Sequence, residues 1–327
     1  MRLPKFTILE PSSLAEALAL LSSHHGAVIK AGGTDLLPRL KLKLSQPKFL
    51  VNLRGLSDLD FIRRNGRGEL CIGALTSLRR IELSPLVRDH FEALADGVAH
   101  IASIEIRHTG TLGGNICLDT RCQFYNQSPL FRKATNPCLK SGGSQCYISK
   151  KGNRCHALFC SDTVPLLIAA DARVKVVSSG GEDIIPLQDF YTGEGKSPHA
   201  LSTDQIVAEI QVPEAVQEAR AAYLKFRFRE GIDFPVVGVA VLAINGGSQR
   251  TSRGVRIVVS GATSGPFRCV KAERMLENGK IGNADLEKVG ERAAGETPIV
   301  STSGCSVSYR RTLVKELVIR GARRVLS

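Results

Sequence analysis

Apolar residues at helical and strand spacing predict a strand, helix, strand order at the start of the chain. The first helix is predicted by four apolar residues on one helical face: Leu14, Ala17, Leu18 and Leu21. Ser13 and Glu16 stand at capping-box spacing where this helix would begin. Strands are expected at 28–30 and 49–53, with a helix around 36–42 between them.

The middle of the chain combines a hairpin signal with further helix and strand patterns. Asn65-Gly66 predicts a hairpin turn ahead of a strand at 69–72. The other elements expected here are helices at 91–102 and 163–170 and strands at 172–178, near Ile184 and at 206–212. By contrast, residues 117–160 show no sustained period of 2 or 3.6, so we expect a long loop held by something other than regular secondary structure.

The last third of the chain groups its strands before its helices, which is typical of an α+β domain. Strands are predicted at 223–228, 236–244 and 255–260, and helices at 267–278, 284–294 and 306–325. The polar stretch 213–218 follows a strand and is the natural boundary. We therefore predict a first domain at 1–216 and a second, with a three-stranded antiparallel sheet and helices, at 217–327.

Composition and charge narrow the class of protein. The 327 residues are 43% hydrophobic, which is enough for a large core. No signal peptide and no apolar run of 18 residues is visible, so we expect a cytoplasmic, reduced protein with no membrane segment. The net charge of +13 indicates an acidic partner: nucleic acid, an anionic cofactor or an acidic protein.

Six of the nine cysteines fall within residues 117–160: Cys117, Cys122, Cys138, Cys146, Cys155 and Cys160. Disulfides, a zinc site or an iron–sulfur cluster would explain such density, and a reducing compartment disfavours the first. Residues 121–155 also carry seven Lys or Arg and no carboxylate. Cations there would stabilise an anionic thiolate cluster and raise its potential.

Two glycine-rich turns carry the second chemical signal. Gly32-Gly33 lies beside Thr34, and Gly113-Gly114 lies near Thr111. Either pair could be a plain positive-φ turn, and neither matches the dinucleotide fingerprint or the phosphate loop. Together, however, exposed backbone N–H groups and hydroxyls are suited to cradle a pyrophosphate.

These residues closely resemble the FAD-binding subunit of the molybdenum hydroxylases, the xanthine dehydrogenase and carbon monoxide dehydrogenase group. The resemblance runs through residues 29–36, 106–116, Ser161-Asp162 and 223–226, in order, along nearly the whole chain. It implies an FAD-binding domain of the PCMH (vanillyl-alcohol oxidase-like) type in two α/β subdomains, followed by the C-terminal domain of these flavoproteins.

The resemblance also implies which residues hold FAD. The first loop would wrap the pyrophosphate with Ile29, Lys30, Ala31, Gly32, Gly33, Thr34, Asp35 and Leu36. The second loop would close on it with Gly110, Thr111, Leu112, Gly113, Gly114 and Asn115. Asp162 would contact the polar groups of the flavin, Lys225 would lie near the isoalloxazine, and Ile101 would pack against the cofactor. His108 stands where relatives usually carry asparagine.

The cysteine segment departs from the family, whose members usually reach the Ser-Asp pair within about ten residues. An insertion with several cysteines resembles 4-hydroxybenzoyl-CoA reductase, whose flavin subunit carries an additional 4Fe–4S cluster in this loop. By this resemblance Cys122, Cys138, Cys146 and Cys155 would bind the cluster, with Cys117 and Cys160 tied to the flavin site. The residue pattern alone does not show which four of the six cysteines would be the cluster ligands.

The expected function is electron transfer toward a partner. Reduced acidic ferredoxin would dock on the basic loop, and electrons would pass through the 4Fe–4S cluster and FAD to 2Fe–2S centres and a molybdenum cofactor on small and large partner subunits. The resemblance implies a dimer of three-subunit units that removes a phenolic hydroxyl from 4-hydroxybenzoyl-CoA in anaerobic aromatic degradation.

Three alternatives remain open from the sequence. A conventional molybdenum hydroxylase flavin subunit would deliver electrons outward, although standard relatives work without the inserted loop. A basic, zinc-containing nucleic-acid-binding protein would fit the charge and the cysteines. Its stacking platforms would be poor, because aromatic residues make up 5% of the chain and tryptophan is absent. A structural scaffold is the third.

Overall fold

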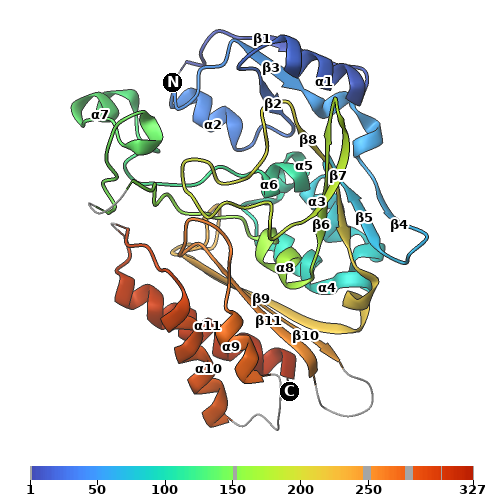
Figure 1. Ribbon diagram of the computed structural model, residues 1–327, viewed down its shortest axis with the longest axis vertical. Coiled ribbons are helices and arrows are strands. Elements are labelled where there is room, and N and C mark those ends of the chain that lie inside the picture. Colours follow the sequence, from blue (N-terminus) through green and yellow to red (C-terminus); the bar gives the residue numbers. More distant parts are fainter. Residues whose placement is uncertain (1, 150–152, 246–251, 277–282, 303, 327) are drawn as a thin grey trace.

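Three β-sheets follow one another along the long axis of the molecule (Figure 1). The computed structural model describes residues 2–149, 153–245, 252–276, 283–302 and 304–326. No helix among these residues is long and apolar enough to cross a membrane. Five short 3-10 helices connect the main elements: η1 (Leu53–Gly55), η2 (Ser57–Leu59), η3 (Leu139–Ser141), η4 (Glu214–Glu218) and η5 (Arg274–Leu276).

The N-terminal sheet is parallel and carries the first glycine loop at the end of a strand. Its order is β1 (Thr7–Leu9), β3 (Phe49–Asn52), β2 (Val28–Lys30). Helix α1 (Leu14–Ser23) buries the predicted face, and α2 (Leu36–Lys41) follows the loop. Ser13 caps α1 as predicted, but Glu16 reaches back to Ser12 rather than completing a capping box with Ser13.

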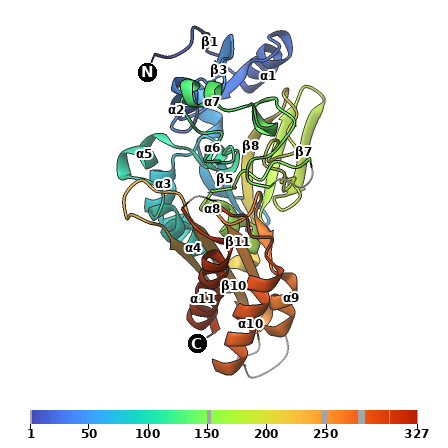
Figure 2. The same ribbon diagram turned by 90° about the vertical axis from the view of Figure 1, so that its left-hand side faces the viewer.

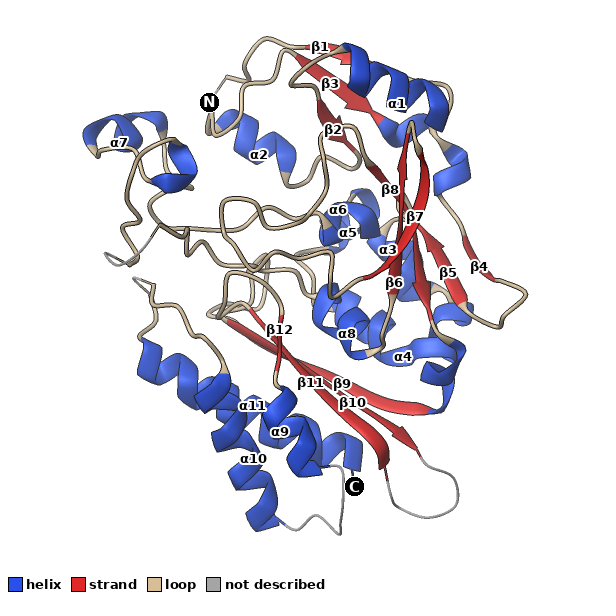
Figure 3. Ribbon diagram, viewed as in Figure 1, coloured by secondary structure: helices blue, strands red, loops and turns tan. Residues whose placement is uncertain are grey.

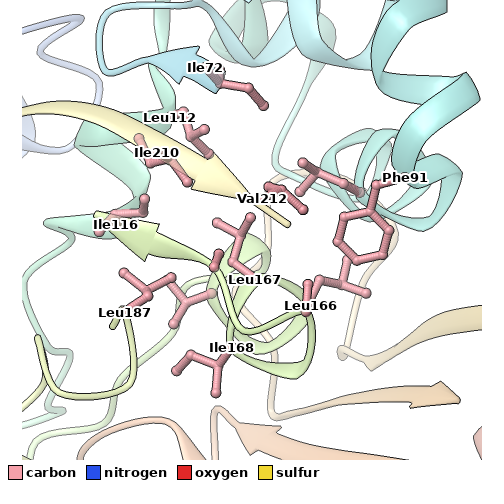
Figure 4. Packing of buried hydrophobic residues seen from close by; sticks show 14 of the residues in the cluster. Ile72, Phe91, Leu112, Ile116, Leu166, Leu167, Ile168, Leu187, Ile210 and Val212 are labelled. Carbon is pink, nitrogen blue, oxygen red and sulfur yellow. The ribbon is translucent and has the colours of Figure 1, made fainter. Parts of the chain in front are cut away.

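The second sheet is antiparallel and joins distant parts of the first domain. Its order is β4 (Ile62–Arg64), β5 (Leu70–Gly73), β8 (Ile206–Val212), β6 (Arg173–Ser178), β7 (Gly181–Pro186). The hairpin predicted at Asn65-Gly66 is formed by β4 and β5. Apolar side chains from this sheet and from the neighbouring helices make the main core, which includes Ile72, Leu112, Leu167 and Ile210 (Figure 4).

Four helices contribute to this core: α3 (Leu78–Leu83), α4 (Pro85–Ala99), α6 (Leu112–Ile116) and α8 (Thr163–Ala169), while α5 (Ile104–Thr109) packs against α3. The helix predicted at 91–102 corresponds to the second part of α4, which is broken at Phe91 (φ −153°, ψ 71°), but α4 as a whole begins earlier and ends sooner than predicted. It begins at Pro85, because Ser84 accepts a hydrogen bond from the Val87 N–H and proline favours the first helical position. It stops at Ala99, and Ala102 already has a positive φ of 45°. The pattern also missed α3.

The C-terminal sheet is antiparallel with four strands, not the three predicted. Its order is β12 (Phe267–Arg268), β11 (Ser252–Ser260), β10 (Val237–Asn245), β9 (Ala219–Phe226). The extra strand arises because Phe267 and Arg268 pair with β11 before any helix begins. The helices that follow are α9 (Val270–Glu273), α10 (Asn283–Glu296) and α11 (Val307–Leu326). Residues 277–278 of the predicted helix lie outside the described residues.

Strand β10 is apolar along its length because both faces of its sheet are covered (Figure 3). Val239 and Val241 belong to the cluster shared with α11, whereas Ala240 and Leu242 belong to the main core under α8. The C-terminal sheet therefore packs on the first domain with one face and on its own helices with the other.

The cysteine segment, residues 117–160, leaves the first domain and returns to it. Its two ends pair through the Arg121 N–H to the Leu158 carbonyl and the reverse bond, both 2.7 Å. Contrary to the expectation of an irregular loop throughout, it contains a short helix, α7 (Pro129–Ala134), capped by Ser128. Arg132 of α7 donates to the carbonyls of Leu42 and Lys43, so α7 lies beside the C-terminal end of α2 (Figures 1 and 2).

Candidate functional site

The two glycine loops, about 75 residues apart in the sequence, meet in the structure. A Cβ on Gly32 would lie 2.0 Å from the carbonyl oxygen of Thr109, so only glycine allows this approach. Gly33 has a positive φ of 76°. The first loop, α2 and α5 line an open groove of about 290 Å³, formed by Gly32, Gly33, Thr34, Leu37, Pro38, Glu105, Ile106 and Thr109. Residues 110–115 of the second loop follow directly after this lining and do not belong to it.

The second loop is shorter and more helical than the glycine-rich turn predicted at 109–115. It is the junction between α5 and α6, and the Thr111 hydroxyl caps α6 by accepting from the Gly114 N–H at 3.1 Å. Gly113 is required by packing, since a Cβ there would lie 2.8 Å from Ala74. The loop N–H of Gly113 donates to the Ala74 carbonyl at 2.9 Å.

The segment after β5 therefore belongs to the groove's framework, and the sequence reasoning missed it. The Thr76 carbonyl accepts from the Leu112 N–H at 3.0 Å, and the Gly110 carbonyl accepts from the Leu78 N–H at 2.8 Å. Ser77 forms a β-bridge with Thr111 and caps α3. The sequence signal for this segment was the Thr76-Ser77 pair, which follows a buried strand closely and stands where a helix-capping residue is expected.

Asn115 links the second loop to the end of the cysteine segment. Its side-chain oxygen accepts from the hydroxyls of Ser161 and Thr163, each at 2.7 Å. The two sequence-predicted motifs, the second glycine loop and Ser161-Asp162, are thus brought together. This contact fixes Asp162 at the start of α8 relative to the groove.

Asp162 and Lys225 form a buried ion pair between the two parts of the chain. The Lys225 ammonium lies 3.0 Å from Asp162 Oδ2, and the Tyr223 hydroxyl donates to Asp162 Oδ1 at 2.7 Å. The Lys225 side chain is only 2% exposed, so it is not a solvated lysine. Burial raises the pKa of Asp162 above its ordinary value, and the charge of Lys225 opposes that rise.

Ile101 lies in a tight turn between α4 and α5 and is buried. Its carbonyl accepts from Arg107 Nη1 at 2.7 Å, and the neighbouring His100 carbonyl accepts from Lys225 at 3.1 Å. Arg107 is itself buried and pairs with Glu82 at 2.8 Å. The turn is therefore held by cations from both parts of the chain. His108 is exposed on α5.

The four cysteines assigned to a cluster line one small, partly open cavity inside the insertion. Its lining comprises Cys122, Phe124, Tyr125, Cys138, Leu139, Lys140, Cys146, Tyr147, Cys155 and Ala157. Cys117 and Cys160 do not line it. They lie at the base of the insertion, where burial raises the pKa of each thiol to about 12. All nine cysteines lie in the described residues and all are free thiols.

Hydrogen-bond donors point at the sulfur atoms of this cavity. The Cys122 sulfur accepts from the backbone N–H groups of Phe124 and Tyr125, and the Cys138 sulfur accepts from the Ser141 hydroxyl at 3.3 Å. Burial raises the pKa of Cys155 to about 11, and the Ala157 N–H and Lys140 act in the opposite direction. Such donors stabilise negative charge on sulfur, which bound thiolates carry.

The cavity differs from a zinc site. Among the described residues, no group of three His, Cys, Asp or Glu side chains converges closely enough to hold a single metal ion. Four thiolates on zinc would all lie about 2.3 Å from one atom. Cysteines spread around a common cavity fit a larger group in which each sulfur binds a different iron. The donor set, four cysteine thiols around one cavity, has the ligand chemistry of an iron–sulfur cluster.

Ion pairs connect the cysteine segment to the first glycine loop. Arg121 pairs with Asp35, which begins α2, and Arg39 of α2 lies 2.7 Å from Asp119. Asp119 in turn lies 2.6 Å from Lys140 at the cavity. The groove and the cysteine cavity are consequently built on one connected framework.

The chain has the architecture of an FAD-binding flavoprotein of the PCMH type. A parallel sheet is joined to an antiparallel sheet, and two glycine loops meet beside an open groove. Residues 4–215 match the family model described as the FAD binding domain in molybdopterin dehydrogenase. Residues 221–325 match the CO dehydrogenase flavoprotein C-terminal domain. The chain therefore belongs to the FAD-binding medium subunits of the molybdenum hydroxylases, and it is an oxidoreductase subunit.

Individual relatives agree along the chain. It is 31% identical, over 84% of its length and 86% of the relative's, to the aldehyde oxidoreductase FAD-binding subunit of Escherichia coli K12. It is 26% identical to the 6-hydroxypseudooxynicotine dehydrogenase complex subunit alpha of Paenarthrobacter nicotinovorans, over 100% of this chain and 96% of that protein.

The same fold occurs in a carbon monoxide dehydrogenase structure from Hydrogenophaga pseudoflava, with a TM-score of 0.82 and 24% identity over 99% of this chain and 98% of that one. The predicted fold class and the predicted binding of FAD are confirmed. The alternative of a zinc-containing nucleic-acid-binding protein has no support from these matches.

Proposed function

We propose that this chain is the FAD- and 4Fe–4S-carrying electron-transfer subunit of a molybdenum-containing 4-hydroxybenzoyl-CoA reductase. The observation that carries the proposal is the meeting of Cys122, Cys138, Cys146 and Cys155 around one cavity with hydrogen-bond donors aimed at the sulfurs. When bound, a cluster supplies single electrons and FAD stores two, which matches a one-electron donor to a two-electron reduction.

The residues of this chain have separate tasks in that scheme. The loops at 29–36 and 110–115 hold the pyrophosphate of FAD at the groove. Asp162, Lys225 and Ile101 form the wall facing the flavin ring. The four cavity cysteines bind the cluster, and the rings of Phe124, Tyr125 and Tyr147 line the same cavity. No organic substrate is bound by this subunit, since its reduction takes place on a partner.

The proposed partners follow from the kind of subunit. Relatives are named as subunits, among them a nicotine 6-hydroxylase medium subunit and a xanthine dehydrogenase FAD-binding subunit. We infer a large molybdenum-cofactor subunit and a small 2Fe–2S subunit in a dimer of three-subunit units, in a reducing cytoplasm. An acidic ferredoxin would dock on the basic insertion and donate electrons inward, so that the phenolic hydroxyl of the aromatic thioester is removed reductively.

A second candidate is a dehydrogenase flavin subunit that passes electrons outward. It is favoured by the names of the relatives, which include xanthine, caffeine and nicotinate dehydrogenase subunits. Anaerobic addition of dithionite-reduced ferredoxin to the purified complex separates the two. Bleaching of the flavin supports the inward route, and an oxidised flavin with excess ferredoxin supports the outward one.

The cluster itself is tested by iron, acid-labile sulfide and flavin content with a visible spectrum of anaerobically purified protein. We expect about four iron atoms and one FAD per chain. Cys146→Ser should lower iron sharply and leave FAD bound. Cys269→Ser is the matched control, because this buried thiol lies in the C-terminal core, 3.6 Å from the Thr297 hydroxyl. Zinc in place of iron, or FAD loss with iron retained in Cys146→Ser, would contradict the assignment.

A further inference from the structure

Lys140 is a cation built into the wall of the cysteine cavity. Its side chain is 4% exposed, and it lines the cavity together with the four cysteines. A buried lysine is unusual unless its charge is paired and its donors are satisfied. The contacts of Lys140 therefore show how its buried charge is stabilised.

All three N–H donors of the Lys140 ammonium have a partner. They lie 2.6 Å from Asp119 Oδ1, 2.6 Å from Thr120 Oγ1 and 2.6 Å from the Gly195 carbonyl. An ammonium has three donors and no acceptor, so its hydrogen-bonding capacity is filled. The charge is consequently fixed in position and cannot swing into solvent.

The local charge count at this point is positive. Asp119 is shared by two cations, because its other oxygen lies 2.7 Å from Arg39. Two cations on one carboxylate leave one surplus positive charge at Asp119, whereas Glu194, which accepts from the Cys155 N–H at 2.8 Å, acts against that surplus at Cys155. Lys140 Nζ also lies 5.3 Å from the centroid of the Tyr125 ring, which lines the same cavity. Because the Lys140 side chain is only 4% exposed, water screens its charge little.

The other described basic residues of the insertion do not line the cavity. Lys133 is exposed on α7, and Arg132 is engaged by backbone carbonyls after α2. Arg154 donates to the Gly193 carbonyl, and Arg121 pairs with Asp35. Lys150 and Lys151 lie outside the described residues.

We propose that Lys140 is a positioning residue that holds a fixed positive charge against the cysteine-bound cluster and raises its reduction potential. This inference rests on the proposed function, because it requires a cluster in the cavity. Reduction adds one negative charge to the group held by the cysteines. A fixed cation in the wall stabilises the reduced form more than the oxidised form, while Asp119 offsets part of the effect.

The test is a redox titration of the cluster, followed by EPR, on the purified complex. Lys140→Gln should lower the equilibrium constant for cluster reduction about tenfold, which is about 59 mV for a one-electron couple. Asp119→Asn should move the potential in the opposite direction, because it leaves two cations unopposed. Lys133→Gln is the control, since it removes the same charge from an exposed position of the same insertion and should change the potential little.

Opposite shifts in Lys140→Gln and Asp119→Asn support the proposal, because mere loosening of the cavity would not reverse sign. A Lys140→Gln potential equal to that of wild type or of Lys133→Gln overturns it. If Lys140→Gln purifies without the EPR signal of a 4Fe–4S cluster, Asp119→Asn decides: a raised potential supports the proposal, and an unchanged or lower one, or loss of that signal in both variants, overturns it. A wild-type complex without a 4Fe–4S signal instead overturns the proposed function.

Discussion

Gly32 is the residue at which the two glycine loops, proposed to hold FAD, touch. We expect Gly32→Ala to weaken FAD binding about tenfold or more, because the new methyl group would overlap the Thr109 carbonyl and push the loops apart. The measurement is the dissociation constant from quenching of flavin fluorescence. Gly55→Ala is the control, since nothing lies within 4 Å of a Cβ placed there. Unchanged FAD affinity in Gly32→Ala would show that the loops can separate without cost.

The buried pair of Asp162 and Lys225 makes a second prediction at the residue scale. Lys225→Met should lower the free energy of unfolding by about 3–5 kcal/mol at pH 8, because it leaves a buried carboxylate without its cation. Urea unfolding of the full chain measures this. In the double variant Asp162→Asn/Lys225→Met the uncompensated charge is absent, so much of the stability should return.

The pH dependence of that loss has a definite sign. Burial raises the pKa of Asp162 in the folded chain above 3.8. As pH rises from the unfolded-state pKa to the folded-state pKa, the unfolded chain loses this proton first, so the free energy of unfolding falls. Lys225 is the main group opposing the rise. Without it the window extends to higher pH, and the destabilisation by Lys225→Met should be larger at pH 8 than at pH 5. A loss independent of pH would exclude Asp162 as its cause.

Elements with a strong periodic pattern could be predicted from the sequence. The buried face of α1 and the strands β6 and β8 lie where the apolar spacing placed them. Helix α3 was missed because it is six residues long and shows too little periodicity. Strand β12 was taken for the start of a helix, because a two-residue strand is specified only by its partner β11.

The spatial arrangement of the cysteine segment could be predicted only in part from its residue types. Clustered cysteines and basic residues indicated a ligand-binding insertion. Their sorting into four around one cavity and two at the base, however, depends on contacts with the rest of the chain. The burial of Lys140 depends on Gly195, which lies 55 residues later. Neither contact follows from local spacing.

Helix α7 presents exposed apolar and basic side chains on the insertion. Leu130 and Phe131 are 79% and 39% exposed, and Lys133 beside them is also exposed. If an acidic donor docks here, Lys133→Glu should lower the rate of flavin reduction by ferredoxin several-fold and weaken its dependence on salt. Stopped-flow reduction at two ionic strengths measures both. Lys288→Glu, on exposed α10, is the matched control, and equal effects of the two variants would rule out docking at α7.

At the scale of the whole molecule, the predicted boundary at 213–218 separates two sequence patterns but not two independent cores. Tyr223, Leu242 and Val258 come from the C-terminal sheet, and they are part of the main core of the first domain. The Asp162 and Lys225 pair crosses the same boundary. The C-terminal sheet is therefore needed to cover α4 and α8.

This shared core predicts a single cooperative unfolding transition. Leu242→Ala removes a side chain on the face toward the first domain, and Ile257→Ala removes one on the face toward the C-terminal helices. Both residues are fully buried, so each substitution should cost about 2–5 kcal/mol. If the sheet couples the two halves, calorimetry should show one transition in wild type, moved to lower temperature by either variant. If the halves unfolded separately, wild type would show two transitions, and Ile257→Ala would lower only one of them.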